Sequence, residues 1–117
     1  MARIAVMDDE QSARSAIKRI LEREGHEVLD FEDAAPALEE VDYATVDLAV
    51  VDLQMPTSGY DAIEEIRARG HKDLPIIVVS AHVDLVWTPD VLDVQDIVRK
   101  PFSTTQFAET VTALLSS

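Results

Sequence analysis

The chain has 117 residues, 47% of them apolar and 28% charged, so it is long and apolar enough for one domain with a buried core. It contains no cysteine, which excludes thiol catalysis, zinc–thiolate sites and disulfides. Its formal net charge of -13 would repel a phosphate backbone, so DNA and RNA are excluded as direct ligands.

The start of the chain shows no signal sequence. After Arg3 the apolar residues run only over positions 4–7 before acidic residues follow, and no stretch approaches the length that spans a membrane. We therefore expect a cytoplasmic protein with no membrane partner.

Short apolar runs alternate along the chain with stretches of helical spacing. Runs rich in Val and Ile predict five strands, at residues 4–7, 28–31, 48–51, 76–79 and 97–98. Apolar spacing predicts helices over residues 13–21, 34–43, 60–66 and 107–115. Gly25 and Gly70 mark two helix ends, Ser58-Gly59 opens the third helix, and Ser103 or Thr104 caps the last. This alternation predicts one compact α/β domain over residues 1–117, with a parallel sheet covered on both faces.

The segment at residues 81–94 departs from this pattern. Its apolar residues keep no clean helical period, and Pro89 prevents a helix from running through it. Thr88, Pro89 and Asp90 together form a start signal for a helix. We expect a loop to Trp87 and then a short helix to about Val94.

Acidic residues follow two of the predicted strands. The first strand ends in Asp8, Asp9 and Glu10, and the third ends in Asp52. Because the carboxyl ends of parallel strands lie along one edge of a sheet, these carboxylates can converge. Carboxylates in close contact need a cation among them, and oxygen ligands without His or Cys favour a hard ion such as magnesium. The pattern indicates a magnesium site suited to phosphoryl chemistry, although Asp8 and Asp9 could also cap the following helix.

Further motifs complete an ordered set along the chain. The set comprises Asp8-Asp9, Asp52 with Pro56 and Gly59 behind it, Ser80-Ala81, and Lys100-Pro101-Phe102. No single member is specific, but in this order they resemble the receiver domain of bacterial two-component response regulators over essentially the whole chain. The resemblance implies a flavodoxin-like (βα)5 doubly wound fold, with five parallel strands in the order 2-1-3-4-5.

The resemblance also implies a function. Asp52 would accept a phosphoryl group from the phosphohistidine of a histidine kinase or a histidine phosphotransfer protein. Magnesium would be bound directly by Asp9, Asp52 and the backbone carbonyl of Gln54, while Asp8 would act through a coordinated water. The domain would not be an enzyme, because its only chemistry is its own phosphorylation and dephosphorylation.

Two further residues have roles in this resemblance. Lys100 would pair with Asp52 at rest and with a phosphoryl oxygen afterwards. A cis peptide bond before Pro101 would aim the Lys100 side chain inward. The hydroxyl of Ser80 would donate to another phosphoryl oxygen.

The chain departs from the family in the region that forms the output surface. Receivers usually carry Tyr or Phe three residues before the lysine, where this chain has Ile97, and the interval from Ser80 to Lys100 is shorter than usual. We therefore expect signalling through a non-standard output face. A downstream protein or a second copy of the chain could contact the apolar residues of the segment at residues 81–94, which are Val83, Leu85, Val86 and Trp87. The alternative for Trp87 is that its side chain folds back over the core.

Gln54 and His82 stand at positions that flank the phosphoryl group in the family and adjust how fast water removes it. In this chain His82 could orient that water, block it or be merely solvated.

Three other functions share part of this pattern. A haloacid-dehalogenase phosphatase would place its second acid two residues after the first, where Glu10 stands, but it would need a longer chain for its cap and metal-loop elements. A flavodoxin-like FMN module would need a loop that cradles phosphate, and Asp8-Asp9-Glu10 would repel phosphate without a metal. The main alternative is a receiver-like interaction module that works without phosphorylation.

Overall fold

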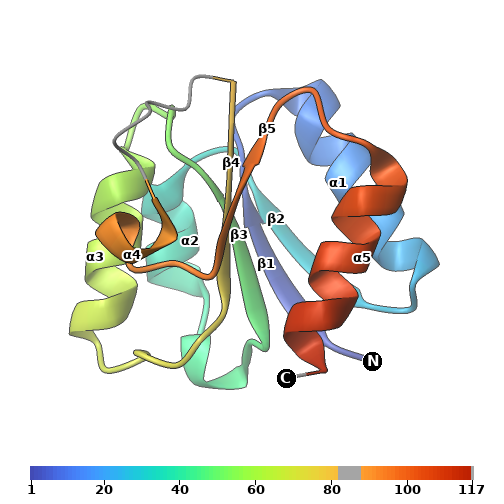
Figure 1. Ribbon diagram of the computed structural model, residues 1–117. Coiled ribbons are helices and arrows are strands. Elements are labelled where there is room, and N and C mark those ends of the chain that lie inside the picture. The colour runs from blue at the N-terminus through green and yellow to red at the C-terminus, as the bar shows by residue number, and fades with distance from the viewer. Residues whose placement is uncertain (82–87, 117) are drawn as a thin grey trace.

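Five parallel strands form the centre of the computed structural model, which describes residues 1–81 and 88–116. The sheet order is β2-β1-β3-β4-β5, with strands Arg3–Met7 (β1), Glu27–Phe31 (β2), Leu48–Asp52 (β3), Ile76–Ser80 (β4) and Asp96–Arg99 (β5). The helices are Gln11–Arg23 (α1), Ala34–Glu40 (α2), Gly59–Ala68 (α3), Pro89–Leu92 (α4), Thr104–Leu115 (α5) and a 3-10 helix, Tyr43–Thr45 (η1). One face of the sheet carries α1 and α5, and the other carries α2, α3 and α4 (Figure 1). This architecture confirms the predicted doubly wound fold and strand order.

Side chains on the two faces of the sheet build two separate cores. Ile4 and Val6 of β1 pack in a cluster with Phe107 of α5, on the side of α1. Ala5 and Met7, the alternate residues of β1, belong to the cluster on the side of α2 and α3. All residues of β3 and β4 are buried, because helices cover both faces of these central strands. This double burial explains why the sequence shows continuous apolar runs rather than alternation.

The carboxyl ends of the strands and the two ends of the chain lie at opposite edges of the sheet. The carboxyl ends of the strands lie at the upper edge in Figure 1, whereas both ends of the chain lie at the lower edge. Met1 and Ala2 line one pocket at that lower edge together with Leu114 and Leu115 of α5. A site at the carboxyl edge is therefore separated from both ends of the chain by the length of the strands.

Local signals set most helix boundaries as predicted. Gly25 and Gly70 follow α1 and α3 with φ angles of 87° and 101°, a conformation that favours glycine. The Ser58 hydroxyl accepts a hydrogen bond from the Tyr60 N–H at the start of α3, and Ser103 does the same for Gln106 in α5. Among the described residues, no helix has the length and apolar composition needed to cross a bilayer.

The second helix is shorter than predicted. We expected it to reach Tyr43, but α2 ends at Glu40 and Val41 is extended. The Asp42 carboxylate accepts a hydrogen bond from the Ala44 N–H, which stabilises the separate 3-10 turn that begins at Tyr43. Tyr43 is nevertheless buried on the same side of the sheet as α2. Its apolar spacing in the sequence therefore resembled that of one more helical turn.

The short helix after Pro89 forms as predicted, but α4 ends at Leu92 rather than near Val94. Thr88 caps it, because its hydroxyl accepts a hydrogen bond from the Val91 N–H. Asp93 then adopts the left-handed conformation, with φ at 58°, which stops the helix. The predicted loop before Trp87 lies outside the described residues.

A buried arginine anchors the region between α4 and β5. The Arg67 guanidinium, on α3, donates hydrogen bonds to the carbonyl oxygens of Asp93, His71 and Leu74 at 2.7–3.2 Å. It also lies 3.4 Å from the Gln95 side-chain oxygen. Arg67 is only 8% exposed and its contact with the Leu74 carbonyl is buried, so that carbonyl would lack a partner if the arginine side chain were removed. The arginine therefore joins the end of α3 to the start of β5.

We predict that Arg67→Ala lowers the free energy of unfolding by about 3 kcal/mol, because the buried Leu74 carbonyl and the partly buried His71 and Asp93 carbonyls lose their donor. Urea denaturation followed by circular dichroism measures this change. The matched control is Arg69→Ala at the C-cap of α3, which removes an exposed pair with Glu65 and an exposed hydrogen bond to the Leu38 carbonyl and should cost less than about 1 kcal/mol. Equal losses for the two variants would contradict the anchoring role of Arg67.

Candidate functional site

The carboxyl edge of the sheet gathers the predicted site residues. Asp8 follows the last residue of β1, Asp52 is the last residue of β3, and Lys100 follows the last residue of β5. Met7 pairs with Val51 in the sheet, so β1 and β3 end side by side and deliver their acids to the same place. The sheet thus brings together residues that are far apart in the sequence.

Three carboxylates converge at this edge. One carboxylate oxygen from each of Asp8, Asp9 and Asp52 lies within 4.8 Å of the others. Asp8 is fully buried and Asp52 is 3% exposed, while Asp9 is open to solvent. All the ligand atoms of this cluster are oxygens, a donor set that suits magnesium. The residues present therefore fit a magnesium ion, with Asp9 on the solvent side.

Lys100 provides a positive charge inside the acid cluster. Its Nζ atom lies 2.8 Å from Asp8 Oδ2 and 3.4 Å from Asp52 Oδ2, with Glu10 Oε1 at 3.7 Å. The Lys100–Pro101 peptide bond is cis, as expected from the resemblance. The ammonium group thus bridges the two buried carboxylates.

Burial and charge change the acidity of the central pair. Burial of the Asp52 carboxyl raises its pKa from 3.8 to about 6, and the neighbouring Asp8 charge adds to this rise. The Gln54 N–H and the Lys100 charge act in the opposite direction. Burial lowers the pKa of Lys100, but its contacts with Asp8 and Asp52 outweigh burial and raise the pKa above the ordinary value. Lys100 therefore remains a cation throughout the neutral range.

The remaining predicted residues flank the acids. Gln54 is exposed, and its backbone N–H donates a hydrogen bond of 3.1 Å to Asp52 Oδ1. Ser80 is fully buried as the last residue of β4, and its carbonyl oxygen accepts a hydrogen bond from the Lys100 N–H. Both lie at the edge expected for them. His82 lies outside the described residues, as do the apolar contact candidates Val83, Leu85, Val86 and Trp87.

Two contributions to the site were not predicted from the sequence. Gly59 was expected to open a helix and to belong to the motif behind Asp52, but its packing role was not predicted: a Cβ atom there would overlap the Asp52 carbonyl oxygen and come within 2.7 Å of the Leu53 Cα. The glycine thus lets α3 begin directly against the backbone of the central aspartate. Arg14 of α1 donates a hydrogen bond of 2.8 Å to the Asp8 carbonyl oxygen, and the spacing of α1 gave no signal for this contact.

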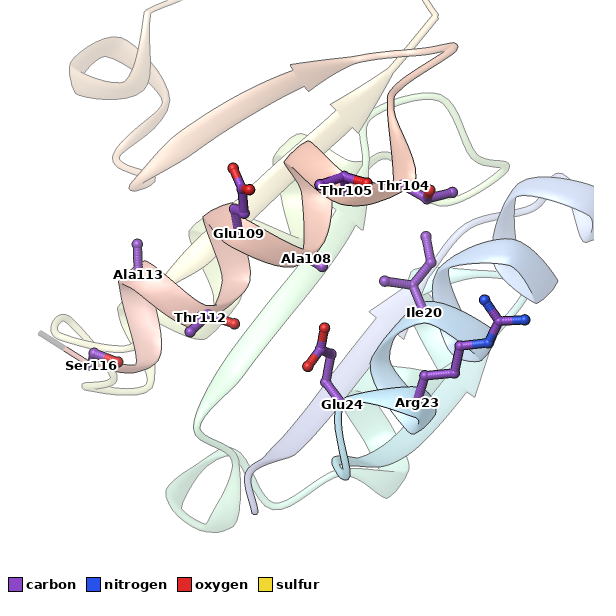
Figure 2. A pocket seen from close by; sticks show the side chains of 10 residues that line it. All are labelled: Ile20, Arg23, Glu24, Thr104, Thr105, Ala108, Glu109, Thr112, Ala113 and Ser116. Atoms are coloured by element: carbon purple, nitrogen blue, oxygen red, sulfur yellow. The ribbon is translucent and has the colours of Figure 1, made fainter.

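A groove between two helices is separate from the acid edge. It has a volume of about 610 Å³ and lies between α1 and α5, as Figure 2 shows. Ile20 and Arg23 of α1 line one side, and small residues of α5 such as Ala108 and Thr112 line the other. None of the converging carboxylates lines this groove, so the site chemistry belongs to the sheet edge.

The geometry agrees with the family comparison. A model of the response regulator receiver domain matches residues 4–112. The chain belongs to the response regulator receiver family. Receiver domains bind Mg²⁺ at an acidic pocket, interact with histidine kinases and downstream effectors, and are not enzymes in the usual sense.

Curated relatives of this receiver domain are longer proteins. It is 32% identical over 119 residues to the sensory transduction protein RegX3 of Mycobacterium tuberculosis, covering 98% of this chain and 51% of RegX3. It is 35% identical over 118 residues to the two-component response regulator PhoP of Pseudomonas aeruginosa, covering 97% and 51%. The chain thus spans about half the length of these curated relatives.

Solved structures of receivers superimpose on the domain. The response regulator TrrA of Thermotoga maritima, in complex with Mg²⁺-BeF, has a TM-score of 0.85 at 32% identity, covering 97% of this chain and 99% of TrrA. The chemotaxis protein CheY4 of Vibrio cholerae has a TM-score of 0.87 at 22% identity, covering 97% and 98%, and so shares the fold. Membership of the receiver family, rather than the fold alone, favours a receiver over a phosphatase or an FMN module.

We predict that Asp52→Asn stabilises the metal-free receiver at neutral pH. The folded-state pKa of Asp52, about 6, exceeds its ordinary value of 3.8, so its contribution to stability is present at low pH and lost as pH rises through 6. In EDTA at pH 7, the variant should gain about 1–3 kcal/mol in the free energy of unfolding, and the gain should vanish near pH 4.

Urea denaturation in EDTA at both pH values measures this difference. Glu64→Gln, an exposed change on α3, is the control and should alter stability little at either pH. A gain from Asp52→Asn that is equal at pH 7 and pH 4 would show that loss of the titrating charge is not its cause.

Proposed function

We propose that residues 1–117 act as a single cytoplasmic receiver domain that accepts a phosphoryl group on Asp52. The donor is the phosphohistidine of a histidine kinase or of a histidine phosphotransfer protein. The observation that carries this proposal is the meeting of three carboxylates within 4.8 Å, with Lys100 Nζ 3.4 Å from Asp52 Oδ2. A structural ion pair alone would not need the third, solvent-exposed carboxylate of Asp9.

The transfer step follows from the position of Asp52. One Asp52 carboxylate oxygen attacks the phosphorus in line, forming a P–O bond while the P–N bond to the donor histidine breaks. The histidine nitrogen leaves with the electron pair of that bond. The product is an acyl phosphate on Asp52, which is the signalling state.

The surrounding residues have distinct roles in this proposal. Asp9, Asp52 and the Gln54 carbonyl would bind magnesium directly, and Asp8 would act through a coordinated water. Bound magnesium supplies neutralisation of the charge on the transferring phosphoryl oxygens. Lys100 would move from its resting pairs to one phosphoryl oxygen, and the Ser80 hydroxyl would donate to another.

The structure of TrrA supports this assignment by similarity. That receiver carries Mg²⁺-BeF and covers 97% of this chain at 32% identity. Beryllium fluoride bound to a carboxylate oxygen has the tetrahedral shape of a phosphoryl group. The same ligand pair is therefore a suitable probe of the acid cluster in this receiver.

Signal output would use a non-standard face. Ile97 of β5 is half-buried and packs against the core on the side of α2 and α3, without the ring that receivers usually carry there. An isoleucine cannot carry a polar group between the pocket and the surface. We propose that the activated domain contacts a downstream protein or a second copy of itself through the region around α4 and β5.

We predict that incubation with magnesium and acetyl phosphate adds one phosphoryl group to the protein, because the acid cluster aligns Asp52 with a small acyl phosphate. Intact-mass spectrometry detects the addition, and Asp52→Asn should abolish it. Asp61→Asn, which changes an exposed aspartate of α3, is the control and should be labelled like the wild type. No labelling from acetyl phosphate or from any kinase would favour the interaction module that works without phosphorylation.

We also predict that beryllium fluoride with magnesium changes the fluorescence of Trp87, the only tryptophan in the chain. Trp87 lies in the segment that departs from the family pattern, so its emission reports on a response there. The change should be absent in Asp52→Asn and present in Asp61→Asn. An unchanged emission in a protein that takes up acetyl phosphate would argue against a switching role for this segment.

A further inference from the structure

Two loops at the carboxyl edge are joined by one pair of side chains. Asp33 lies between β2 and α2, and Thr57 lies between β3 and α3. The Thr57 N–H donates a 2.8 Å hydrogen bond to Asp33 Oδ1, and the Thr57 hydroxyl donates one of 2.7 Å to Asp33 Oδ2. Both loops leave the upper edge of the sheet toward helices on the same face (Figure 1). This pair of residues is called the loop clasp below.

Asp33 stands at the N-cap position of α2, but its carboxylate bonds to Thr57 in another loop. It is the N-cap residue of α2, and its side chain makes no capping hydrogen bond that meets standard geometry. Both carboxylate oxygens are instead directed to Thr57. Burial raises the pKa of Asp33, but the hydrogen bonds from Thr57, together with the nearby backbone N–H groups of Ala34 and Ala35, outweigh this and lower the pKa below 3.8. The clasp therefore contains a carboxylate at neutral pH, and its hydrogen bonds are charge-assisted.

The clasp acts on the loop that carries Gln54. At the start of the loop, the Gln54 N–H donates a hydrogen bond to Asp52 Oδ1. At its end, the Gly59 N–H donates a 3.2 Å hydrogen bond back to the Leu53 carbonyl. Thr57 is the third fixed point, and it lies between Gln54 and Gly59. The loop is thus held at both ends and in its middle, with the middle contact supplied by Asp33 from the loop between β2 and α2.

We propose that Asp33 and Thr57 are positioning residues, which hold the backbone carbonyl of Gln54 in place for magnesium. This inference rests on the proposed function, because it assigns a role toward the same metal. Outer contacts that orient metal ligands affect affinity strongly, and their loss costs about tenfold or more. A loop freed at its middle would have to be ordered each time the cation binds.

The test is the magnesium affinity of clasp variants, measured by isothermal titration calorimetry without any phosphodonor. Thr57→Val removes the hydroxyl hydrogen bond without changing charge, and Asp33→Asn weakens both bonds. Each should lower the affinity for Mg²⁺ about tenfold. Thr57→Ser keeps both donors and should bind as the wild type does.

Controls separate positioning from charge and from general stability. Glu32→Gln removes an exposed charge next to Asp33 and should lower the affinity much less than Asp33→Asn does. Thr45→Val removes a comparable threonine hydrogen bond, to the Asp42 carbonyl, before β3 at the opposite edge of the sheet. It should leave the affinity unchanged even if the free energy of unfolding falls.

The initial rate of labelling by acetyl phosphate provides a second readout. The Thr57→Val rate should fall at low magnesium and recover when magnesium saturates the site. Unchanged magnesium affinity in Thr57→Val and Asp33→Asn would overturn the inference while leaving the phosphoacceptor function intact. Failure of the wild-type protein to take up phosphoryl would instead overturn the proposed function.

Discussion

The receiver depends on one electrostatic constraint: two buried carboxylates, Asp8 and Asp52, share a single ammonium group. Without a cation their repulsion in a poorly solvated place would oppose folding. Lys100 Nζ lies within 3.4 Å of an oxygen of each, so the ends of β1, β3 and β5 must lie at one level. The parallel sheet meets this condition, because its register pairs Met7 with Val51 and Ser80 with Arg99. Asp9, whose carboxylate lies on the solvent side of this pair, could contact a further cation there.

Much of this arrangement was predicted from the sequence, because its signals are local. Strands buried on both faces appear as apolar runs, and acids that follow such runs must lie at the carboxyl edge. The α/β fold and the convergence of the acids were therefore predicted correctly from these signals, whereas the strand order, also confirmed, was implied by the resemblance to receivers. The end of α2 was not, because Tyr43 satisfies the helical spacing while Asp42 supports a different turn. Helix spacing detects which residues are buried and does not detect which backbone hydrogen bonds are made.

Contacts between distant polar side chains were also missed. Asp33 and Thr57 are 24 residues apart, and Arg67 and Asp93 are 26 apart. Nothing near any of these residues in the chain indicates its partner, since each contact depends on how two loops or helices approach in space. From the sequence, Asp33 resembles a helix cap and Arg67 resembles an exposed charge on α3. Both serve instead to hold irregular segments against the regular framework.

Both ends of the chain lie at the lower edge of the sheet, away from the acid cluster (Figure 1). A dye, an affinity tag or a surface tether joined to either end would therefore leave the reactive edge open to an incoming protein. Immobilised in this way, the receiver would present its carboxylates outward in one orientation. Binding kinetics could then be recorded on a sensor chip without masking the reacting groups.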